Sequence, residues 1–352
     1  MRKVMAKSRQ PTRGATVVDV AKRAGVSSMT VSRVINCRPG VSEETRALVE
    51  DAIKALAYTP NVAARNLVTS TELRIGVIYS SVSAAFMSEF LTGVFEEASS
   101  RGARLILLKG ENGRAPNVTA LKKLLASGLS GVLLAPPFGE APEVLRVLRE
   151  AGCPMAAVGA YQSPDKICVR IDDRAASYQM TRLLLDLGHR RIGFILGNPD
   201  QAASAERMAG FYAAVREREG VEVQVVQGDF TYVSGLAAAE HLLTLPKRPT
   251  AIFASNDDMA AAVVSVAHRQ HLDVPAELTV VGFDDTAAAS TLWPPLTTVH
   301  QPVRQLAAEA LGLLIAEIGA QPGKSRVPRE SILDHEIVKR QSTGVPSPSS
   351  PA

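Results

Sequence analysis

A short stretch near the N-terminus places side chains suited to reading DNA on one face of a predicted helix. Ser28, Met29 and Arg33 lie on the face opposite Val31 and Val34, and no carboxylate interrupts that face. An arginine in this position can donate two hydrogen bonds to the O6 and N7 atoms of guanine, and Met29 can contact a thymine methyl group or a base edge. These residues predict a helix that enters the major groove of DNA.

Hydroxyl, amide and guanidinium groups surround this face and could bind the DNA backbone. Such contacts fix the register of a protein on the duplex but read no sequence. For each serine or threonine the alternative is a helix cap or a solvated surface position. The candidates for phosphate contacts are Ser27, Thr30, Asn36, Ser42, Thr45 and Arg46.

A second group of polar side chains follows strand-like runs later in the chain. Asn256 and Asp257 end the run TAIFASND, and Asp284 and Asp285 end the run LTVVGFDD. Ligands of open α/β sheets bind outside the carboxyl ends of the strands. Asp257 and Asp285 could instead cap the helices that follow. In the same way, the pair in VRIDD, residues 172–173, could supply a cap and an anchor for a chain crossing.

The residues give little support for an enzyme. Asp284 and Asp285 are paired acids, but neighbours on a strand point to opposite faces and would not flank one glycosidic bond. His268 and His271 lack a supporting carboxylate cluster and read as solvated side chains. No glycine-rich phosphate loop is present. We expect no catalysis, no cofactor and no metal ion.

The DNA-reading face requires two short helices joined by a tight turn. Thr16 is a candidate N-cap, with Asp19 three residues later, as in a capping box. Gly25 suits the left-handed position that ends a helix, and Ser27 can cap the second helix. This pattern predicts a helix-turn-helix, whose second helix is the one that enters the major groove.

Two further segments follow the helix-turn-helix. Ser42 can cap a third helix over residues 43–57. Asn61 can then cap a short segment over residues 62–68, which is too short to be a stable helix alone in water. We therefore expect that segment to need a partner helix, DNA or both.

Composition and charge agree with a DNA-binding protein of the cytoplasm. The chain has 352 residues, of which 46% are apolar and 21% charged. Its three cysteines show no metal or redox spacing, and we find no signal peptide and no apolar run long enough to span a membrane. Residues 1–74 carry a net charge of +7, which leaves −3 for the remainder of a chain whose total is +4. The basic part coincides with the helix-turn-helix, where attraction to phosphate is useful.

From residue 74 onward, strand-like and helical runs alternate. The strand-like runs are nearly continuous in apolar residues, as expected for parallel strands covered on both faces. The series is long enough for two such sheets. The runs span residues 74–80, 104–110, 131–137, 154–160, 191–198, 222–229, 250–257 and 278–285.

The segments DVAKRAGVSSMTVSRVIN, VSEETR and YTPNVAARNL together closely resemble the DNA-binding head of the lactose-repressor (LacI/GalR) family. The resemblance implies an α/β fold with an all-α head, a hinge helix and a two-lobed core like that of periplasmic binding proteins. The expected divisions are a disordered basic arm at 1–15, a helix-turn-helix domain at 16–59, a hinge at 60–72, a core at 73–340 and a disordered tail at 341–352. Within the core, lobe one would hold about 73–171 and 302–328, and lobe two about 172–300 and 329–340.

The resemblance also implies partners and site residues. Two hinge helices would pair across a homodimer and enter the minor groove of a pseudo-palindromic operator through Ala64 and Leu67, with Leu67 as a wedge. The alternative for this segment is an ordinary linker helix. The effector, a sugar or sugar acid, would lie between the lobes. The residues implied for its binding are Phe86, Arg207, Phe230, Asn256, Asp284 and Gln301.

These observations indicate an effector-controlled transcriptional regulator, most simply a repressor. The family's tetrameric members end in a leucine heptad helix, which this chain lacks, so a dimer is expected. The alternative from another class is a sugar-binding protein without a regulatory role. The helix-turn-helix and the missing signal peptide oppose that alternative.

Overall fold

The computed structural model describes residues 16–35, 41–56, 73–80, 83–110, 113–161, 163–320 and 327–347. The chain divides into two compact units between residues 72 and 73. The predicted hinge at 60–72 lies outside the described residues, as do the predicted basic arm at 1–15 and Asn36. Among the helices of the described part, none is long and apolar enough to cross a membrane.

The first unit is a head of three helices, whose ends are set by local residues. Thr16 and Asp19 form the predicted capping box at the start of the first helix, and the Thr16 amide donates to Asp19 Oδ2 over 2.8 Å. Gly25 ends that helix with φ of 68°, a conformation that glycine adopts without strain. The three helices are α1 (Val17–Ala24), α2 (Ser28–Ile35) and α3 (Glu43–Ala55).

A small apolar core holds the head together. Val20 of α1, Val31 of α2 and Val49 of α3 are fully buried, and Ala21 and Val34 are nearly so. These positions recur at helical spacing, so each helix buries one stripe and leaves its other face exposed. The exposed face of α2 is therefore a consequence of how the head packs.

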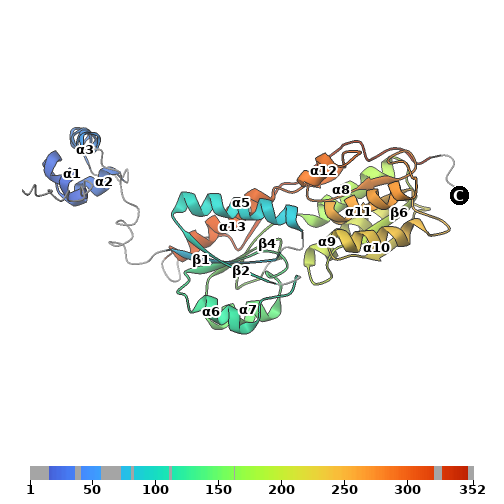
Figure 1. The fold of residues 1–352 in the computed structure, drawn as a ribbon, viewed down its shortest axis with the longest axis horizontal. Coiled ribbons are helices and arrows are strands. Elements are labelled where there is room, and N and C mark those ends of the chain that lie inside the picture. Colours follow the sequence, from blue (N-terminus) through green and yellow to red (C-terminus); the bar gives the residue numbers. More distant parts are fainter. Residues whose placement is uncertain are drawn as a thin grey trace, which may run out of the picture. The chain divides into compact units, whose positions relative to one another are not determined.

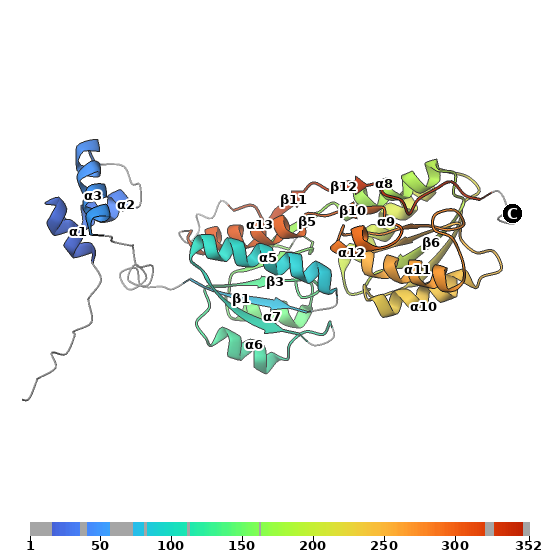
Figure 2. The ribbon, with the colours of Figure 1, turned by 45° about the horizontal axis from the view of Figure 1, so that its top comes forward.

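The second unit begins with a six-stranded parallel sheet, which we call lobe one (Figure 1). Helices cover both faces of this sheet: α5 and α13 lie on one face, and α6 and α7 on the other (Figure 2). The strand order is β11-β5-β4-β3-β1-β2. The strands are β1 (Arg74–Tyr79), β2 (Arg104–Lys109), β3 (Gly131–Leu134), β4 (Met155–Val158), β5 (Ile167–Ile171) and β11 (Glu330–Leu333). The helices are α5 (Ala84–Arg101), α6 (Val118–Leu125), α7 (Pro142–Glu150) and α13 (Val303–Ile318).

A four-stranded parallel sheet in the order β7-β6-β8-β9 forms lobe two. Helices α8 and α9 pack on one face and α10 and α11 on the other. The prediction of two parallel sheets is thus confirmed. The strands are β6 (Arg191–Leu196), β7 (Glu222–Gln227), β8 (Ala251–Ala254) and β9 (Thr279–Val281). The helices are α8 (Asp173–Asp186), α9 (Ala202–Val215), α10 (Tyr232–Leu243), α11 (Asp257–Arg269) and α12 (Ala287–Thr291).

Three segments carry the chain between the lobes, and one of them corrects the predicted division. The chain crosses after β5, after β10 (Thr298–His300) and after β11. The prediction that residues 329–340 belong to lobe two is wrong for its first part, because β11 pairs in parallel with β5 of lobe one. Only β12 (Glu336–Val338) lies with lobe two, where it pairs antiparallel with β10.

The C-terminal segment is also ordered further than its composition indicates. The prediction of a disordered tail from residue 341 is wrong for residues 341–347, which lie along lobe two. Ser342 is fully buried, donates to the carbonyl oxygen of Val280 and accepts from the Thr297 amide. His189 bonds to the carbonyl oxygen of Gly344 over 2.9 Å. These long-range hydrogen bonds hold a segment that has no apolar pattern of its own.

Candidate functional site

The face of α2 predicted to read DNA is open to solvent. Met29 is 69% exposed, which is unusual for a large apolar side chain, and Ser28 and Arg33 are exposed beside it. Arg33 lies in the last turn of α2, and the first turn of this helix carries no acid. A methionine that the head leaves uncovered, next to an arginine, fits contact with base edges better than it fits a role in folding.

The predicted phosphate contacts divide into helix caps and other positions. Ser27 Oγ accepts from the Thr30 amide over 3.1 Å, and Ser42 Oγ accepts from the Thr45 amide over 3.3 Å, so both serines cap helices. Their hydroxyls also bond to the hydroxyls of Thr30 and Thr45. Both serines are exposed, and Arg46 is half-buried. The helix ends that these serines cap present backbone N–H groups that favour anions.

A cavity lies between the two lobes of the second unit. It holds about 700 Å³ of empty space, counting the part that opens to solvent. All six residues predicted for effector binding line it, although they come from six separate parts of the chain. Its main lining residues are Ser80, Ser83, Phe86, Met87, Pro136, Pro137, Val158, Arg170, Asp173, Gln201, Arg207, Phe230, Asn256, Asp284, Gln301 and Leu306.

Arg207 of α9 is the central polar residue of this cavity. Its Nε donates to Asp173 Oδ1 over 2.8 Å, and its Nη1 donates to the carbonyl oxygen of Ser255. The guanidinium carbon lies 3.5 Å from the ring centroid of Phe283. The arginine is only 5% exposed, so these contacts hold its planar group in one orientation.

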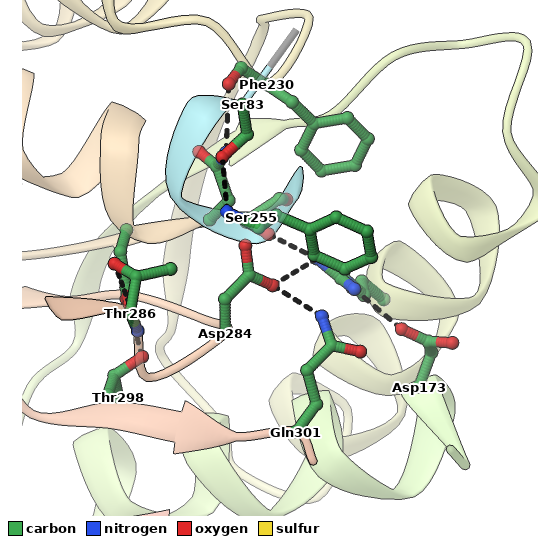
Figure 3. Close-up of polar contacts among 12 residues, drawn as sticks. Ser83, Asp173, Phe230, Ser255, Asp284, Thr286, Thr298 and Gln301 are labelled. Carbon is green, nitrogen blue, oxygen red and sulfur yellow. Dashed lines mark hydrogen bonds and ion pairs between the residues drawn. The ribbon is translucent and has the colours of Figure 1, made fainter. Parts of the chain in front are cut away.

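Asp284 and Gln301 meet beside this arginine, and Figure 3 shows their two side chains turned toward each other. Gln301 Nε2 donates to Asp284 Oδ1 over 2.6 Å, and Arg207 Nη1 lies 3.9 Å from the same oxygen. Burial raises the pKa of Asp284 well above its usual range, while Arg207 opposes that shift. Asp284 has φ of 114°, a strained backbone conformation for any residue with a side chain. Such strain concentrates at ligand sites, where the surrounding structure maintains it.

The ring of Phe230 is held in place by its own backbone conformation and by Gly197, which has no side chain to displace it. Phe230 has φ of 72°, and Asn256 Nδ2 donates to its carbonyl oxygen over 2.9 Å. The ring lies directly on the backbone of Gly197, where an added Cβ would stand 2.0 Å from a ring carbon. Two features therefore place Phe230 as a wall of the cavity. Its own backbone has a positive φ, and the residue beneath its ring is a glycine, which leaves room for the ring.

The polar residues that follow β8 could bind a ligand or cap a helix, and the structure distinguishes these roles. Asn256 is the N-cap of α11, and its Oδ1 accepts from the Met259 amide, so both of its polar side-chain groups already have partners. Asp257 makes no such capping contact with α11. Its carboxylate instead accepts hydrogen bonds from the Thr286 amide and the Thr298 hydroxyl. Burial raises the pKa of Asp257 to about 7, although these hydrogen bonds oppose the shift.

Asp285 and the pair at 172–173 complete this set. Asp285 does not cap the following helix, because its carboxylate accepts from Arg340 over 2.6 Å and contacts His300 over 3.0 Å. Asp172 caps α8 through the Ala175 amide. Asp173 instead turns toward the cavity, where it holds Arg207.

Sequence reasoning missed most of the residues that lobe one contributes. Ser80 follows β1 directly, is 1% exposed and lines the cavity, and its Oγ has no hydrogen-bond partner among the described residues. Its place at the carboxyl end of a parallel strand was a usable signal. Met87 and Arg170 of lobe one, and Gln201 of lobe two, were missed because they reach the cavity only through the packing of the two lobes.

The described residues contain no group of three or more His, Cys, Asp or Glu side chains that could hold a metal ion. The cavity presents two arginines, two carboxylates, amides and serine hydroxyls beside aromatic and aliphatic walls. That arrangement can bind a polar molecule with hydroxyl groups. The adjacent acids Asp284 and Asp285 do not face one substrate, since only Asp284 lines the cavity.

Comparisons with known proteins agree with both units. The model for bacterial regulatory proteins of the lacI family matches residues 16–61, and the model for a periplasmic binding protein-like domain matches residues 181–343. Catabolite control protein A of Priestia megaterium is 32% identical over 333 residues, which cover 93% of this chain and 99% of that protein. The HTH-type transcriptional repressor PurR of Pectobacterium carotovorum is 35% identical over 309 residues, covering 86% and 90%.

Solved structures of regulators are similar along nearly the whole chain. A complex of the transcriptional regulator CelR with cellobiose has a TM-score of 0.68 at 32% identity, and the match covers 93% of this chain and 99% of that one. The lac repressor dimer bound to operator and the anti-inducer ONPF has a TM-score of 0.69 at 28% identity, covering 94% and 100%.

Proposed function

Because this chain belongs to the lacI family of bacterial regulatory proteins, it is a DNA-binding transcriptional regulator, and we propose that it is a repressor controlled by a small sugar-like effector in the cavity between its lobes. The regulator acts in the cytoplasm, where its operator lies. The observation that supports the DNA-binding role most strongly is the uncovered face of α2, with Met29 exposed beside Arg33.

Operator reading depends on two copies of the head. A homodimer would place one α2 helix in each of two successive major grooves of a pseudo-palindromic operator. Ser28, Met29 and Arg33 would contact base edges. The proposed phosphate contacts come from the capped helix ends at Ser27 and Ser42 and from Thr30, Asn36, Thr45 and Arg46. The lac repressor dimer solved on its operator is a relative in which two copies act together.

The hinge is proposed from the sequence resemblance alone. Ala64 and Leu67 would enter the minor groove at the operator centre, where Leu67 would partly unstack a base step and bend the DNA. Leu67→Ala should then reduce both operator affinity and DNA bending, with effector affinity unchanged. An operator affinity and bend equal to those of the wild type would contradict the wedge role.

Control by the effector requires that it favour one arrangement of the lobes. Five of the six residues predicted for effector binding lie in lobe two or on a crossing segment, and the sixth, Phe86, lies in lobe one. A molecule in the cavity therefore touches both lobes. A ligand that contacts both lobes stabilises the arrangement in which both contacts form. The effector acts as an inducer if that arrangement separates the two hinges, and as a corepressor if it brings them together.

The test selects operator duplexes from a random pool with the full-length protein and then measures their affinity by fluorescence anisotropy. Arg33→Ala should weaken binding to the selected sequence by about 1–3 kcal/mol and relax preference at one base pair. Lys54→Ala, which removes an equal charge from α3, is the matched control and should leave the preference intact. Uniform weakening across all duplexes by Arg33→Ala would contradict a base-reading role.

A further inference from the structure

We propose that the cavity between the lobes takes an uncharged, hydroxyl-bearing sugar and excludes the corresponding sugar acid. This inference rests on the proposed function, because it names the class of effector that the same cavity would accept. The charges and the open hydrogen-bonding groups of the lining residues carry it.

The positive charges in the cavity wall are already paired. Arg207 Nε lies 2.8 Å from Asp173 Oδ1, with Asp284 Oδ1 3.9 Å from its Nη1, so this guanidinium faces two carboxylates. Arg170, from lobe one, lies 2.8 Å from Glu330 and stacks 4.2 Å from the ring centroid of Tyr161. These two arginines are the basic residues among the described residues that line the cavity.

An anionic ligand would therefore meet no surplus positive charge. With Asp284 ionised, the two arginines stand against three carboxylates, and with Asp284 protonated the set is neutral. A carboxylate entering this space loses its hydration without gaining a free counter-charge. Placed near Asp173 and Asp284, it would also meet like charge, which is strongly unfavourable in a desolvated interface.

The hydrogen-bonding groups that remain open suit hydroxyls. Asp284 Oδ2 and Gln301 Oε1 accept no hydrogen bond within the described residues, and Arg207 Nη2 donates none there. Ser80 Oγ, buried in the lobe-one wall, is likewise without a partner among these residues. A hydroxyl can donate to Asp284 and accept from Arg207 at once, whereas a carboxylate can only accept. A ligand carboxylate placed against the open oxygen of Gln301, or of ionised Asp284, would leave that acceptor without a donor.

Matched pairs of sugars test this discrimination. Isothermal titration calorimetry of the full-length protein would compare glucose with glucuronate, galactose with galacturonate and cellobiose with cellobionate. We expect at least one neutral member to bind, and its acid partner to bind on the order of a hundredfold more weakly. An acid that binds as tightly as its neutral partner, or a panel in which no neutral member binds, would overturn the inference.

Substitution of one carboxylate tests the cause. Asp284→Asn removes the charge and keeps the shape of the side chain, so the backbone at φ of 114° meets no new bulk. The ratio of neutral to acid affinity should fall by about tenfold or more. Asp285→Asn, at the adjacent position with φ of 58° and outside the cavity lining, is the matched control and should keep the wild-type ratio.

An unchanged ratio in Asp284→Asn, with native thermal unfolding, would contradict the proposed role of this carboxylate. Failure of the proposed function would look different. In that case the protein would fail to select an operator, or no bound ligand would alter operator affinity. A regulator that selects its operator and responds only to an anion would keep its proposed function and lose this inference.

Discussion

The two walls of the interlobe cavity differ in chemistry. Lobe two and its crossings supply a fixed arginine, two carboxylates, three amides and an aromatic ring. Lobe one supplies mainly Phe86, Met87, Pro136 and Pro137, together with the ion-paired Arg170 and the Ser80 hydroxyl, which has no partner among the described residues. The difference indicates that an effector would be identified by lobe two and would then draw lobe one onto it by apolar contact. Recognition and closure would thus be assigned to different parts of the chain.

The largest effect is expected from removing the cation of lobe two. Arg207→Ala leaves Asp173 buried without its partner, so the free energy of unfolding should fall by about 3–5 kcal/mol, and effector binding should be lost. Urea unfolding measures the first and calorimetry the second. Asp173→Asn in the same chain should restore part of the stability but none of the binding. Full retention of binding in Arg207→Ala would break the assignment of recognition to lobe two.

The aromatic ring that lobe two contributes to the cavity, Phe230, can be displaced without changing any polar group. Gly197→Ala would set a methyl group against the ring of Phe230 and push it from its place, at a cost of about 1–3 kcal/mol. Effector affinity should fall by about tenfold or more. Combining this change with Phe230→Leu, which removes the ring, should cost much less than the sum of the two changes. Additive losses would mean that Gly197 does not act through Phe230.

The buried acids of lobe two should give the core a pH response. Because the pKa of Asp257 is raised to about 7 in the folded protein, the folded state holds this proton more tightly than the unfolded chain does. Stability should therefore fall as pH rises toward and through 7, by about 1 kcal/mol between about pH 6 and 8. Urea unfolding at both pH values should show this loss in the wild type and a smaller one in Asp257→Asn. Equal losses in the two proteins would assign the response to other groups.

The smallest effect is expected from removing the Ser80 hydroxyl, which tests whether lobe one also contributes a polar contact to the effector. Ser80→Ala removes a hydroxyl with no partner among the described residues, so the free energy of unfolding should change by less than about 0.5 kcal/mol, while effector affinity should fall by about threefold to tenfold. Ser83→Ala is the matched comparison, since Ser83 caps α5 and its loss should cost about 1 kcal/mol of stability. Thermal unfolding and calorimetry together separate the two serines.

The sequence was most informative where structure is decided locally. The capping box of Thr16 and the left-handed Gly25 are properties of neighbouring residues, and both were predicted correctly. The return of residues 329–340 to the core was predicted, but their division between two lobes was not. A pattern of side chains reports that a strand exists; it does not report that β11 will pair with β5, which lies 160 residues earlier in the chain.

The same distinction applies to the cavity. The family resemblance identified Arg207 and Asp284, whereas the role of Asp173 as the partner of Arg207 emerged only from the packing of α8 on α9. A carboxylate beside Asp172 reads as a cap in the sequence, because capping is the local option. Its actual partner is 34 residues away.

Residues 341–347 determine how this protein can be shortened or labelled. A version cut after residue 340 would remove the hydroxyl that the Thr297 amide donates to and the carbonyl oxygen that His189 binds. Both groups lie inside lobe two, where lost partners are costly. A reporter or affinity label is therefore better joined after the last residue than substituted for the tail. The stretch that looks most expendable by composition is one that a protein engineer should keep.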